Sequence, residues 1–175
     1  MKRVFGVRCA AAWCLAVLVV LPLPAVGDEN ALDPGLMDAI ADRDCAAVEA
    51  RLVDGASATG TFEDYMRLQH LPVLFMAVSS GDACIIRSLI RHGAEVDVAF
   101  PDDYLPVMPL ISPLTLAIRA GNPEIVEVLL EAGAHPGLVD REGNDLIPHY
   151  IEDLRRWHEP DTVARIGGLL EKASR

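Results

Sequence analysis

Apolar and polar residues along residues 33–134 follow the order expected for short amphipathic helices arranged in pairs. In SPLTLAIRAGNPEIVEVLLEAGA, residues 112–134, apolar residues recur at intervals of three and four on both sides of a Gly-Asn-Pro break, which predicts one helix before it and one after it. A looser copy, VLFMAVSSGDACIIRSLIRHGA, occupies residues 73–94. Each copy is therefore predicted to form a helix, a tight turn, a second helix and a glycine stop.

The same alanine-to-glycine spacing occurs three times. An alanine in the first helix is followed sixteen residues later by the glycine after the second helix, in the pairs Ala39 and Gly55, Ala77 and Gly93, Ala117 and Gly133. The small alanine side chain allows two helices to approach closely, and glycine ends a helix at low conformational cost. A recurring spacing of this kind predicts a structural repeat.

Residues 112–134 resemble the ankyrin repeat, whose pattern combines a Thr-Pro-Leu-His-Leu-Ala start, a central Gly, a Val/Ile pair, Leu-Leu and Gly-Ala. The matching positions are Ser112, Pro113, Leu114, Leu116, Ala117, Gly121, Ile125, Val126, Leu129, Leu130, Gly133 and Ala134. This resemblance implies an all-α solenoid of about four helix-turn-helix units, expected at residues 33–56, 72–94, 112–134 and 143–173. The fourth unit is placed by Tyr150, 33 residues after Ala117, and is expected to contain an insertion around residues 155–161.

The first 27 residues have the order of a secretory signal peptide. Lys2, Arg3 and Arg8 precede an almost wholly apolar run from residue 9 to residue 23, and the small-residue exit Ala-Val-Gly ends at Gly27. The sequence predicts cleavage near Gly27, export to a bacterial periplasm and a mature ankyrin-repeat domain at residues 28–175. An uncleaved membrane anchor is the alternative, and the apolar run is shorter than a comfortable bilayer span.

The net charge narrows the range of partners. The whole chain carries −11, and removal of residues 1–27 takes away three of 15 basic residues and none of 26 acidic ones, which leaves −14. So acidic a chain is repelled by phosphate backbones and by anionic membrane surfaces. We therefore expect no nucleic acid partner and no stable membrane insertion after signal cleavage, and we expect a protein partner with a basic surface.

Two connections between units are longer than the repeat requires, and they are expected to form hairpin-like loops at residues 57–71 and 95–111. Ankyrin repeats bind partners through their concave side and the loop tips, so aromatic, Met and acidic residues of these loops are predicted to contact a partner. The predicted partner-binding residues are Phe62, Asp64, Tyr65, Met66, Phe100, Asp102, Asp103, Tyr104 and Met108. The alternative is that apolar loop residues only fold back over the stack.

No residue pattern indicates catalysis, a metal site or a cofactor. The histidines of the mature chain are scattered without metal-ligand spacing, and the adjacent carboxylates Asp102 and Asp103 are typical of a solvated turn. No glycine-rich loop suited to phosphate is present in the sequence. The sequence therefore predicts that the protein is not an enzyme.

Two cysteines, Cys45 and Cys84, remain after signal cleavage. They follow Ala39 and Ala77 by six and seven residues, so each is expected at the start of the second helix of adjacent units. An oxidising compartment favours a disulfide between them. Packed helix axes are about 8–10 Å apart, whereas bridged Cα atoms are about 5.5 Å apart, so two unbridged, buried thiols remain the alternative.

Three functions remain from these observations. The first is a periplasmic protein–protein interaction module that binds one partner protein and assists an envelope or stress-defence enzyme. The alternative within this class is an immunity protein that neutralises a cognate secreted toxin, for which an acidic surface is suited because charge accelerates association. The second is an enzyme, for which the sequence offers only the loose acidic pairs. The third is a structural spacer with no specific partner.

Overall fold

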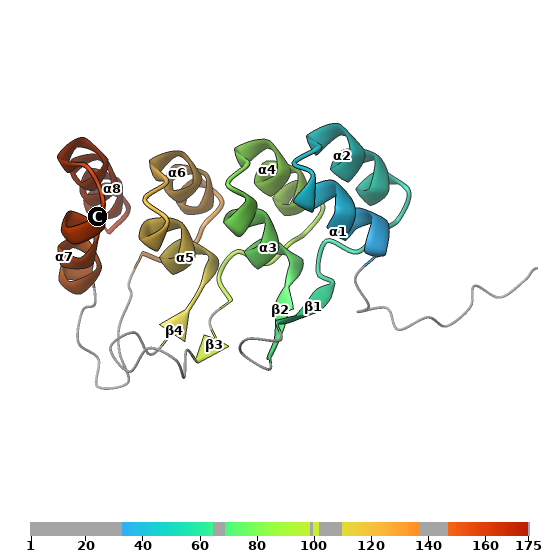
Figure 1. The fold of residues 1–175 in the computed structure, drawn as a ribbon, viewed down its shortest axis with the longest axis horizontal. Helices are drawn as coiled ribbons and strands as arrows, with labels where there is room; N and C mark the ends of the chain where they lie inside the picture. Colours follow the sequence, from blue (N-terminus) through green and yellow to red (C-terminus); the bar gives the residue numbers. More distant parts are fainter. Residues whose placement is uncertain (1–32, 65–68, 99, 102–109, 137–146, 175) are drawn as a thin grey trace, which may run out of the picture.

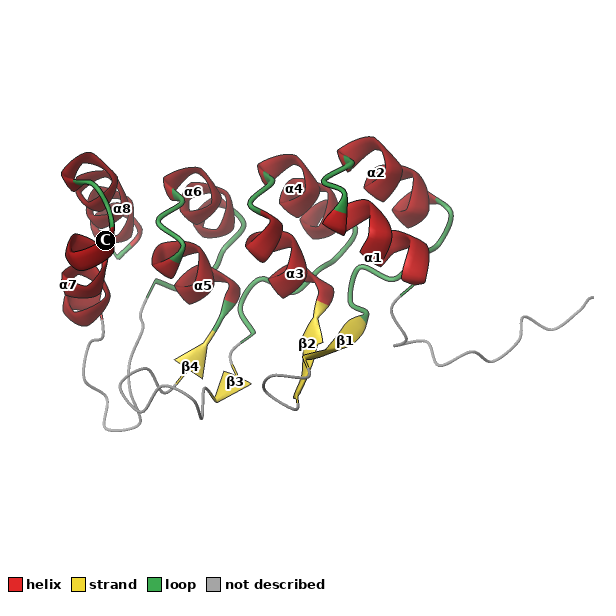
Figure 2. Ribbon diagram, in the orientation of Figure 1, coloured by secondary structure: helices red, strands yellow, loops and turns green. Residues whose placement is uncertain are grey.

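The computed structural model describes residues 33–64, 69–98, 100–101, 110–136 and 147–174. These ranges contain eight helices in four consecutive pairs, with two small sheets between pairs (Figures 1 and 2). The helices are α1 (Pro34–Ala41), α2 (Cys45–Val53), α3 (Val73–Ser80), α4 (Ala83–Arg91), α5 (Pro113–Arg119), α6 (Pro123–Glu131), α7 (Ile147–Trp157) and α8 (Pro160–Ala173). The expected all-α repeat solenoid is confirmed, and the predicted signal peptide lies outside the described residues.

The helix pairs stack side by side in two rows. An inner row contains α1, α3, α5 and α7, and an outer row contains α2, α4, α6 and α8 (Figure 1). Each helix packs against its partner in the pair and against the equivalent helix of the next pair. One apolar core therefore runs through all four units.

The residue at each repeat anchor is buried between the rows. Ala39, Ala77 and Ala117 are buried, and Tyr150 takes the same place in the fourth unit with 2% of its surface exposed. Alanine allows close helix approach in the first three units, whereas the larger tyrosine fills more space in the last one. The unit boundaries expected from the anchors contain the helix pairs observed.

Short polar side chains fix where several helices begin. The carboxylates of Asp33, Asp44 and Asp82 and the amide oxygen of Asn122 accept hydrogen bonds from backbone N–H groups in the first turns of α1, α2, α4 and α6. At α5, Ser112 and Thr115 form a reciprocal capping box. These caps satisfy backbone donors that have no partner within the helix.

The second helix of each of the first three units ends at a glycine with a left-handed backbone. Gly55, Gly93 and Gly133 have φ angles of 101°, 94° and 95°. Other residues adopt this region only with strain, which explains glycine at all three positions. The predicted glycine stops are confirmed.

Both long connections contain strands. β1 (Thr61–Asp64) pairs antiparallel with β2 (Gln69–Pro72), and β3 (Phe100–Pro101) pairs antiparallel with β4 (Leu110–Ile111). β2 leads directly into α3, and β4 leads through Ser112 into α5. The hairpin-like character expected of these connections is therefore present where the structure describes them.

The fourth unit differs from the expected insertion. Helix α7 has 11 residues, against 8, 8 and 7 for the other inner helices, and α8 has 14. Residues 155–157 continue α7, and α8 begins at Pro160. Proline suits this first helical position because the N–H that it lacks would have no partner within the helix. Most of the extra residues therefore lengthen the two helices, and the connection between them stays short.

Candidate protein-binding surface

Two hairpins project from the stack on the side of the inner row (Figure 1). We name the connection of residues 61–72, which the structure describes at residues 61–64 and 69–72, the first finger, and that of residues 100–111, described at residues 100–101 and 110–111, the second finger. Phe62 pairs with Leu71 in the first finger, and Phe100 pairs with Ile111 in the second. The described parts of both fingers thus lie beyond the inner row of helices.

An apolar cluster joins the bases of the two fingers. Leu71 of the first finger, Ile111 of the second and Phe75 of α3 are buried together, with at most 2% of each exposed. Phe62 and Leu116 pack against them and are partly buried. Since this cluster draws on both fingers, their bases are held at a fixed separation.

The predicted partner-binding residues fall into three groups. Phe62 is partly buried in the cluster at the finger bases, so at least part of its side chain contributes to folding. Asp64 lies in β1 opposite Gln69, and Phe100 lies in β3. The others lie outside the described residues: Tyr65, Met66, Asp102, Asp103, Tyr104 and Met108. Their role in binding stays a prediction.

The two fingers are attached to the helices in different ways. At the second finger, the Ser112 N–H donates to Thr115 Oγ1 at 2.7 Å and the Thr115 N–H donates to Ser112 Oγ at 3.1 Å, both buried. At the first finger, Pro72 occupies the N-cap of α3 and makes no side-chain cap hydrogen bond. Its base is instead closed by the Val73 N–H, which donates to the Gly60 carbonyl at 2.8 Å.

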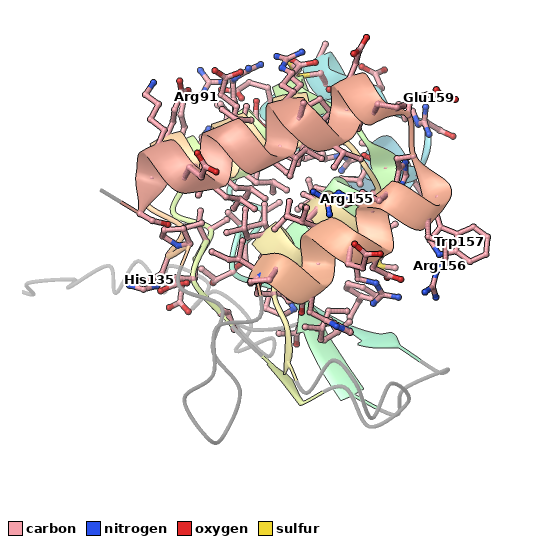
Figure 3. The ribbon with its side chains drawn as sticks, turned by 90° about the vertical axis from the view of Figure 1, so that its left-hand side faces the viewer. Arg91, His135, Arg155, Arg156, Trp157 and Glu159 are labelled. Atoms are coloured by element: carbon pink, nitrogen blue, oxygen red, sulfur yellow. A yellow bond between two sulfur atoms is a disulfide. The ribbon has the colours of Figure 1, made fainter. Side chains whose placement is uncertain are left out.

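An exposed tryptophan marks the corner between α7 and α8. Trp157 is 74% exposed and lies beside Arg156, both pointing away from the helices (Figure 3). The next residue, His158, places Nε2 3.1 Å from the Arg119 carbonyl, and its ring lies against Gly121. The histidine thus fixes the corner on α5 while the tryptophan remains available for contact. Trp157 is not among the predicted partner-binding residues, because it falls in the segment expected to be an insertion.

The outer row is joined covalently at its first seam, between α2 and α4. Cys45, the first residue of α2, and Cys84, the second residue of α4, form a disulfide with Cα atoms 6.0 Å apart. The structure therefore has the predicted disulfide and not the alternative of two free thiols. The bond links the first and second units directly.

Polar contacts surround this disulfide. The Glu49 carboxylate of α2 lies 3.1 Å from Arg91 Nη2 and 3.3 Å from His92 Nε2. A hydrogen bond from the Ser88 hydroxyl lowers the pKa of Glu49 most, the His92 ring and the Arg91 charge lower it further, and burial acts in the opposite direction. Because the carboxylate is favoured here, Glu49 links the two units as an anion.

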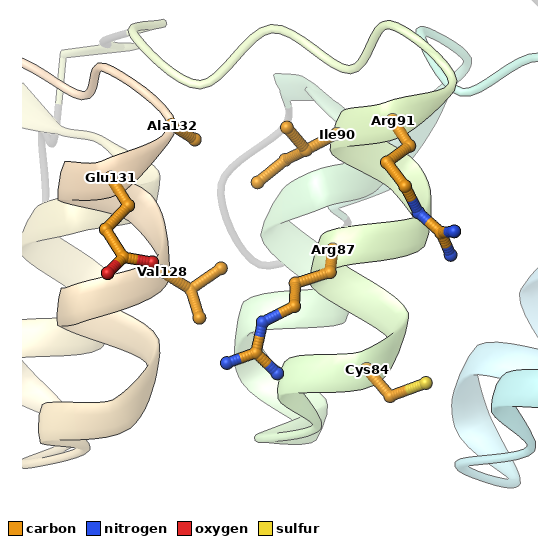
Figure 4. A pocket seen from close by; sticks show the side chains of 7 residues that line it. All are labelled: Cys84, Arg87, Ile90, Arg91, Val128, Glu131 and Ala132. Atoms are coloured by element: carbon orange, nitrogen blue, oxygen red, sulfur yellow. The ribbon is translucent and has the colours of Figure 1, made fainter.

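The later outer seams are crossed by exposed ion pairs. Arg87 lies 3.7 Å from Glu124 across the second seam, and Arg165 lies 3.5 Å from Glu127 across the third. A groove of about 530 Å³ lies between α4 and α6, with a floor that includes Ile90 and Val128 (Figure 4). Its rim carries charges of both signs, so the groove has no clear preference for an acidic or a basic ligand.

We searched the described ranges for clusters of metal-ligating side chains and for membrane-spanning helices. These residues contain no group of three or more His, Cys, Asp or Glu side chains placed to hold a metal ion. No helix in the same ranges has the length and apolar character needed to cross a bilayer.

Comparison with known proteins identifies the fold. A family model of ankyrin repeats in three copies matches residues 36–140. The chain belongs to the ankyrin-repeat family, whose repeats form protein–protein interaction modules. The resemblance of residues 112–134 to this repeat is thereby confirmed.

Two relatives share the repeats. The chain is 33% identical over 76 residues to phosphocholine transferase AnkX of Legionella pneumophila subsp. pneumophila (strain Philadelphia 1), covering 43% of this chain and 7% of the relative. It is 40% identical over 65 residues to human ankyrin repeat and MYND domain-containing protein 1, covering 35% of this chain and 6% of the relative. The similarity spans less than a tenth of the length of either relative. The match to AnkX covers only the repeats.

Proposed function

We propose that this chain is a periplasmic module that binds one partner protein across its two fingers and inner helices and assists an envelope or stress-defence enzyme. The observation that carries the proposal is the common base of the fingers, where Leu71, Phe75 and Ile111 are buried together. A surface whose projecting parts are held at fixed spacing loses little entropy on binding. We further propose that the role is binding and not catalysis.

Charge supports a partner with a basic surface. The chain carries a net charge of −11, and the first 27 residues contribute none of its 26 acidic residues. A strongly acidic protein attracts a basic partner over a distance of about a Debye length, which raises the association rate more than it lowers the dissociation rate. The acidic residues predicted in the fingers, Asp64, Asp102 and Asp103, provide the local part of this attraction.

Export to the periplasm is supported by two independent features. Residues 1–27 have the composition of a signal peptide. The Cys45–Cys84 disulfide is of the kind that persists in oxidising compartments and is rare in the cytosol.

The test is co-purification from the native envelope. A tagged full-length chain would be expressed in its host, and its partners identified from the periplasmic fraction by mass spectrometry. Asp102→Lys/Asp103→Lys reverses charge on the second finger. Glu131→Lys/Glu171→Lys reverses the same amount of charge on exposed positions of α6 and α8 in the outer row, and serves as the matched control.

The proposal expects one stoichiometric partner, with capture reduced about tenfold or more by the finger variant and little changed by the control. A secreted toxin as that partner would support the immunity function instead, and an envelope enzyme would support assistance. Equal losses in both variants would show that net charge alone governs binding and would overturn the role of the fingers. The absence of any stoichiometric partner would leave only the spacer.

A further inference from the structure

The Cys45–Cys84 disulfide encloses one finger and leaves the other outside. The two cysteines are 39 residues apart in sequence, and the whole first finger, residues 61–72, lies between them. The second finger, residues 100–111, lies after Cys84. The covalent loop therefore constrains only one of the two projecting elements of the proposed binding surface.

Apart from this bond, the first unit is held to the second by non-covalent packing like that at the other seams, in which Leu36 and Ile40 of α1 are fully buried. As the terminal unit of the described stack it packs against a single neighbour, through α1 on α3 and α2 on α4. Its outer helix buries Val48 and Leu52, and Arg51 occupies a position where the second and third units have apolar residues. The ion pairs of Glu49 with Arg91 and His92 are partly exposed, and such pairs contribute little.

The first finger depends on the position of the first unit. β1 follows α2 after a short connection that ends at Gly60, and the Gly60 carbonyl accepts the hydrogen bond from Val73. If α2 leaves α4, the connection that ends at Gly60 moves with it and this bond is lost, whereas Phe62 and Leu71 keep their packing against Phe75 and Ile111. The second finger joins α5 through the buried Ser112–Thr115 capping box, which involves no residue of the first unit.

We propose that the Cys45–Cys84 disulfide is a redox control of the first finger, and so of partner binding. This inference rests on the proposed function for its biological meaning. Reduction releases the first unit from the stack and opens the Val73–Gly60 hydrogen bond at the base of the first finger, while the apolar cluster at the finger bases and the third and fourth units keep their structure. Repeat proteins permit such local release because each unit contacts only its neighbours.

The chemistry is thiol–disulfide exchange with a dithiol reductant. One thiolate of the reductant attacks a sulfur of the bond and forms a mixed disulfide, which releases the other protein cysteine as a thiol. The second thiolate of the reductant then attacks the mixed disulfide and releases the first cysteine. Two electrons pass to the protein, which gains two thiols, and the reductant leaves as its own disulfide. Cys84 is solvent-exposed and gives the reductant access.

The test measures hydrogen exchange in the oxidised and reduced full mature chain. Graded dithiothreitol followed by iodoacetamide trapping and mass spectrometry gives the fraction reduced in the native protein. Peptides covering residues 61–73 report the first finger, and peptides covering residues 110–118 report the second. Loss of a closed loop of this length is expected to accelerate exchange of the Val73 amide about 100-fold, while that of Leu116 changes less than about threefold.

A variant without either cysteine separates the disulfide from other effects of the reductant. Cys45→Ser/Cys84→Ser is expected to exchange as fast as the reduced chain, with or without dithiothreitol. Far-UV circular dichroism would show whether the remaining units stay helical. Equal acceleration in both fingers, no acceleration in the first, or a bond that dithiothreitol reduces only after global unfolding would each overturn the inference.

These measurements need no partner, so they can fail while the proposed function stands. Once the co-purification has supplied a partner, its affinity for the oxidised and reduced chains tests the second step. We expect at least a tenfold loss of affinity on reduction. An unchanged affinity despite faster exchange in the first finger would show that the disulfide does not control binding.

Discussion

The two ends of the solenoid are secured in different ways. At the N-terminal end, α2 is tied to α4 by the Cys45–Cys84 disulfide and by polar contacts of Glu49. At the C-terminal end, the corner between α7 and α8 is tied to α5 by the hydrogen bond from His158 to the Arg119 carbonyl. Within the described residues, the first and fourth units each pack against one neighbouring unit, whereas the second and third pack against two.

The difference follows from how much apolar surface each end provides. The fourth unit has long helices that bury Tyr150, Leu154, Ile166 and Leu170. The first unit has helices of 8 and 9 residues and buries Leu36, Ala39, Ile40, Val48 and Leu52, so its core is smaller mainly because alanine stands at the anchor where the fourth unit has tyrosine. A cross-link that restricts the unfolded chain compensates for a small core, whereas a larger core needs only a correctly placed cap. The N-terminal end is therefore the one whose stability responds to redox conditions.

The largest expected effect comes from removing the cross-link. Cys45→Ser/Cys84→Ser should lower the free energy of unfolding of the N-terminal half by about 4 kcal/mol, because the unfolded chain loses a closed loop of some 39 residues. Urea unfolding followed by circular dichroism would measure it, and the C-terminal half should unfold at an unchanged urea concentration. A loss below about 1 kcal/mol would show that the ends do not differ in this way.

The next effect tests the C-terminal cap. At Gly121, with φ of 63°, a Cβ atom would overlap sterically with the His158 ring. Gly121→Ala should therefore cost about 2 kcal/mol, half from backbone strain and half from the displaced histidine. Gly81 has φ of 78°, and a Cβ atom there would meet only Asn122 Nδ2 at an ordinary contact distance of 4.0 Å, so Gly81→Ala should cost only about 1 kcal/mol. Thermal unfolding of both variants gives the comparison.

A double variant isolates the part of the Gly121→Ala stability loss that is due to the His158 ring. His158→Ala removes the ring that the new methyl group would meet, so Gly121→Ala should cost about 1 kcal/mol less in that background. If both backgrounds lose the same stability, the ring does not secure the C-terminal end.

The repeating parts of the fold could be predicted because each depends on local sequence. The apolar spacing around Ala77 and Ala117 fixes which helix faces are buried, and Gly93 and Gly133 fix where the helices end. These requirements recur in each unit and reinforce one another. The fold class and the pairing of helices followed directly from them.

The elements specific to this chain were harder to predict. The distance between Cys45 and Cys84 depends on how closely the first turns of α2 and α4 approach, and their Cα atoms are nearer than typical helix axes. The exposure of Trp157 depends on α7 continuing through a polar segment and on His158 docking onto α5. Both are tertiary features, and neither has a local sequence signal.

The third prediction concerns strain at the N-terminal end. Arg43 occupies the turn position that Gly81 and Gly121 occupy in the next two units, and its φ is 57°. A left-handed conformation is costly for any residue with a Cβ atom. Arg43→Gly should therefore raise the stability of the first unit by about 0.5 to 1 kcal/mol, measured by urea unfolding. Arg43→Ala removes the charge but keeps the strain, and should change stability little. Equal stabilisation by both substitutions would assign the effect to charge.

The smallest effect is a pH dependence at the first seam. The pKa of Glu49 is lowered from its ordinary value of 4.5, chiefly by the Ser88 hydroxyl and then by the His92 ring. A lowered folded-state pKa stabilises the protein above 4.5, and this contribution is lost as the pH falls through the folded-state pKa. The melting temperature of the native chain should exceed that of Glu49→Gln at pH 7, and the difference should shrink below pH 4.5.

Ser88→Ala tests the assigned cause. Ser88 is fully buried, so the loss of its hydroxyl removes the largest influence on Glu49 without exposing new surface. In this background the pKa of Glu49 should move back toward 4.5, so the stability lost through Glu49→Gln should vanish at a higher pH than in the native chain. Glu49 and Ser88 lie on α2 and α4, so such a shift would locate the coupling at the seam that the disulfide closes. An unchanged midpoint would assign the pH dependence to the His92 and Arg91 contacts alone.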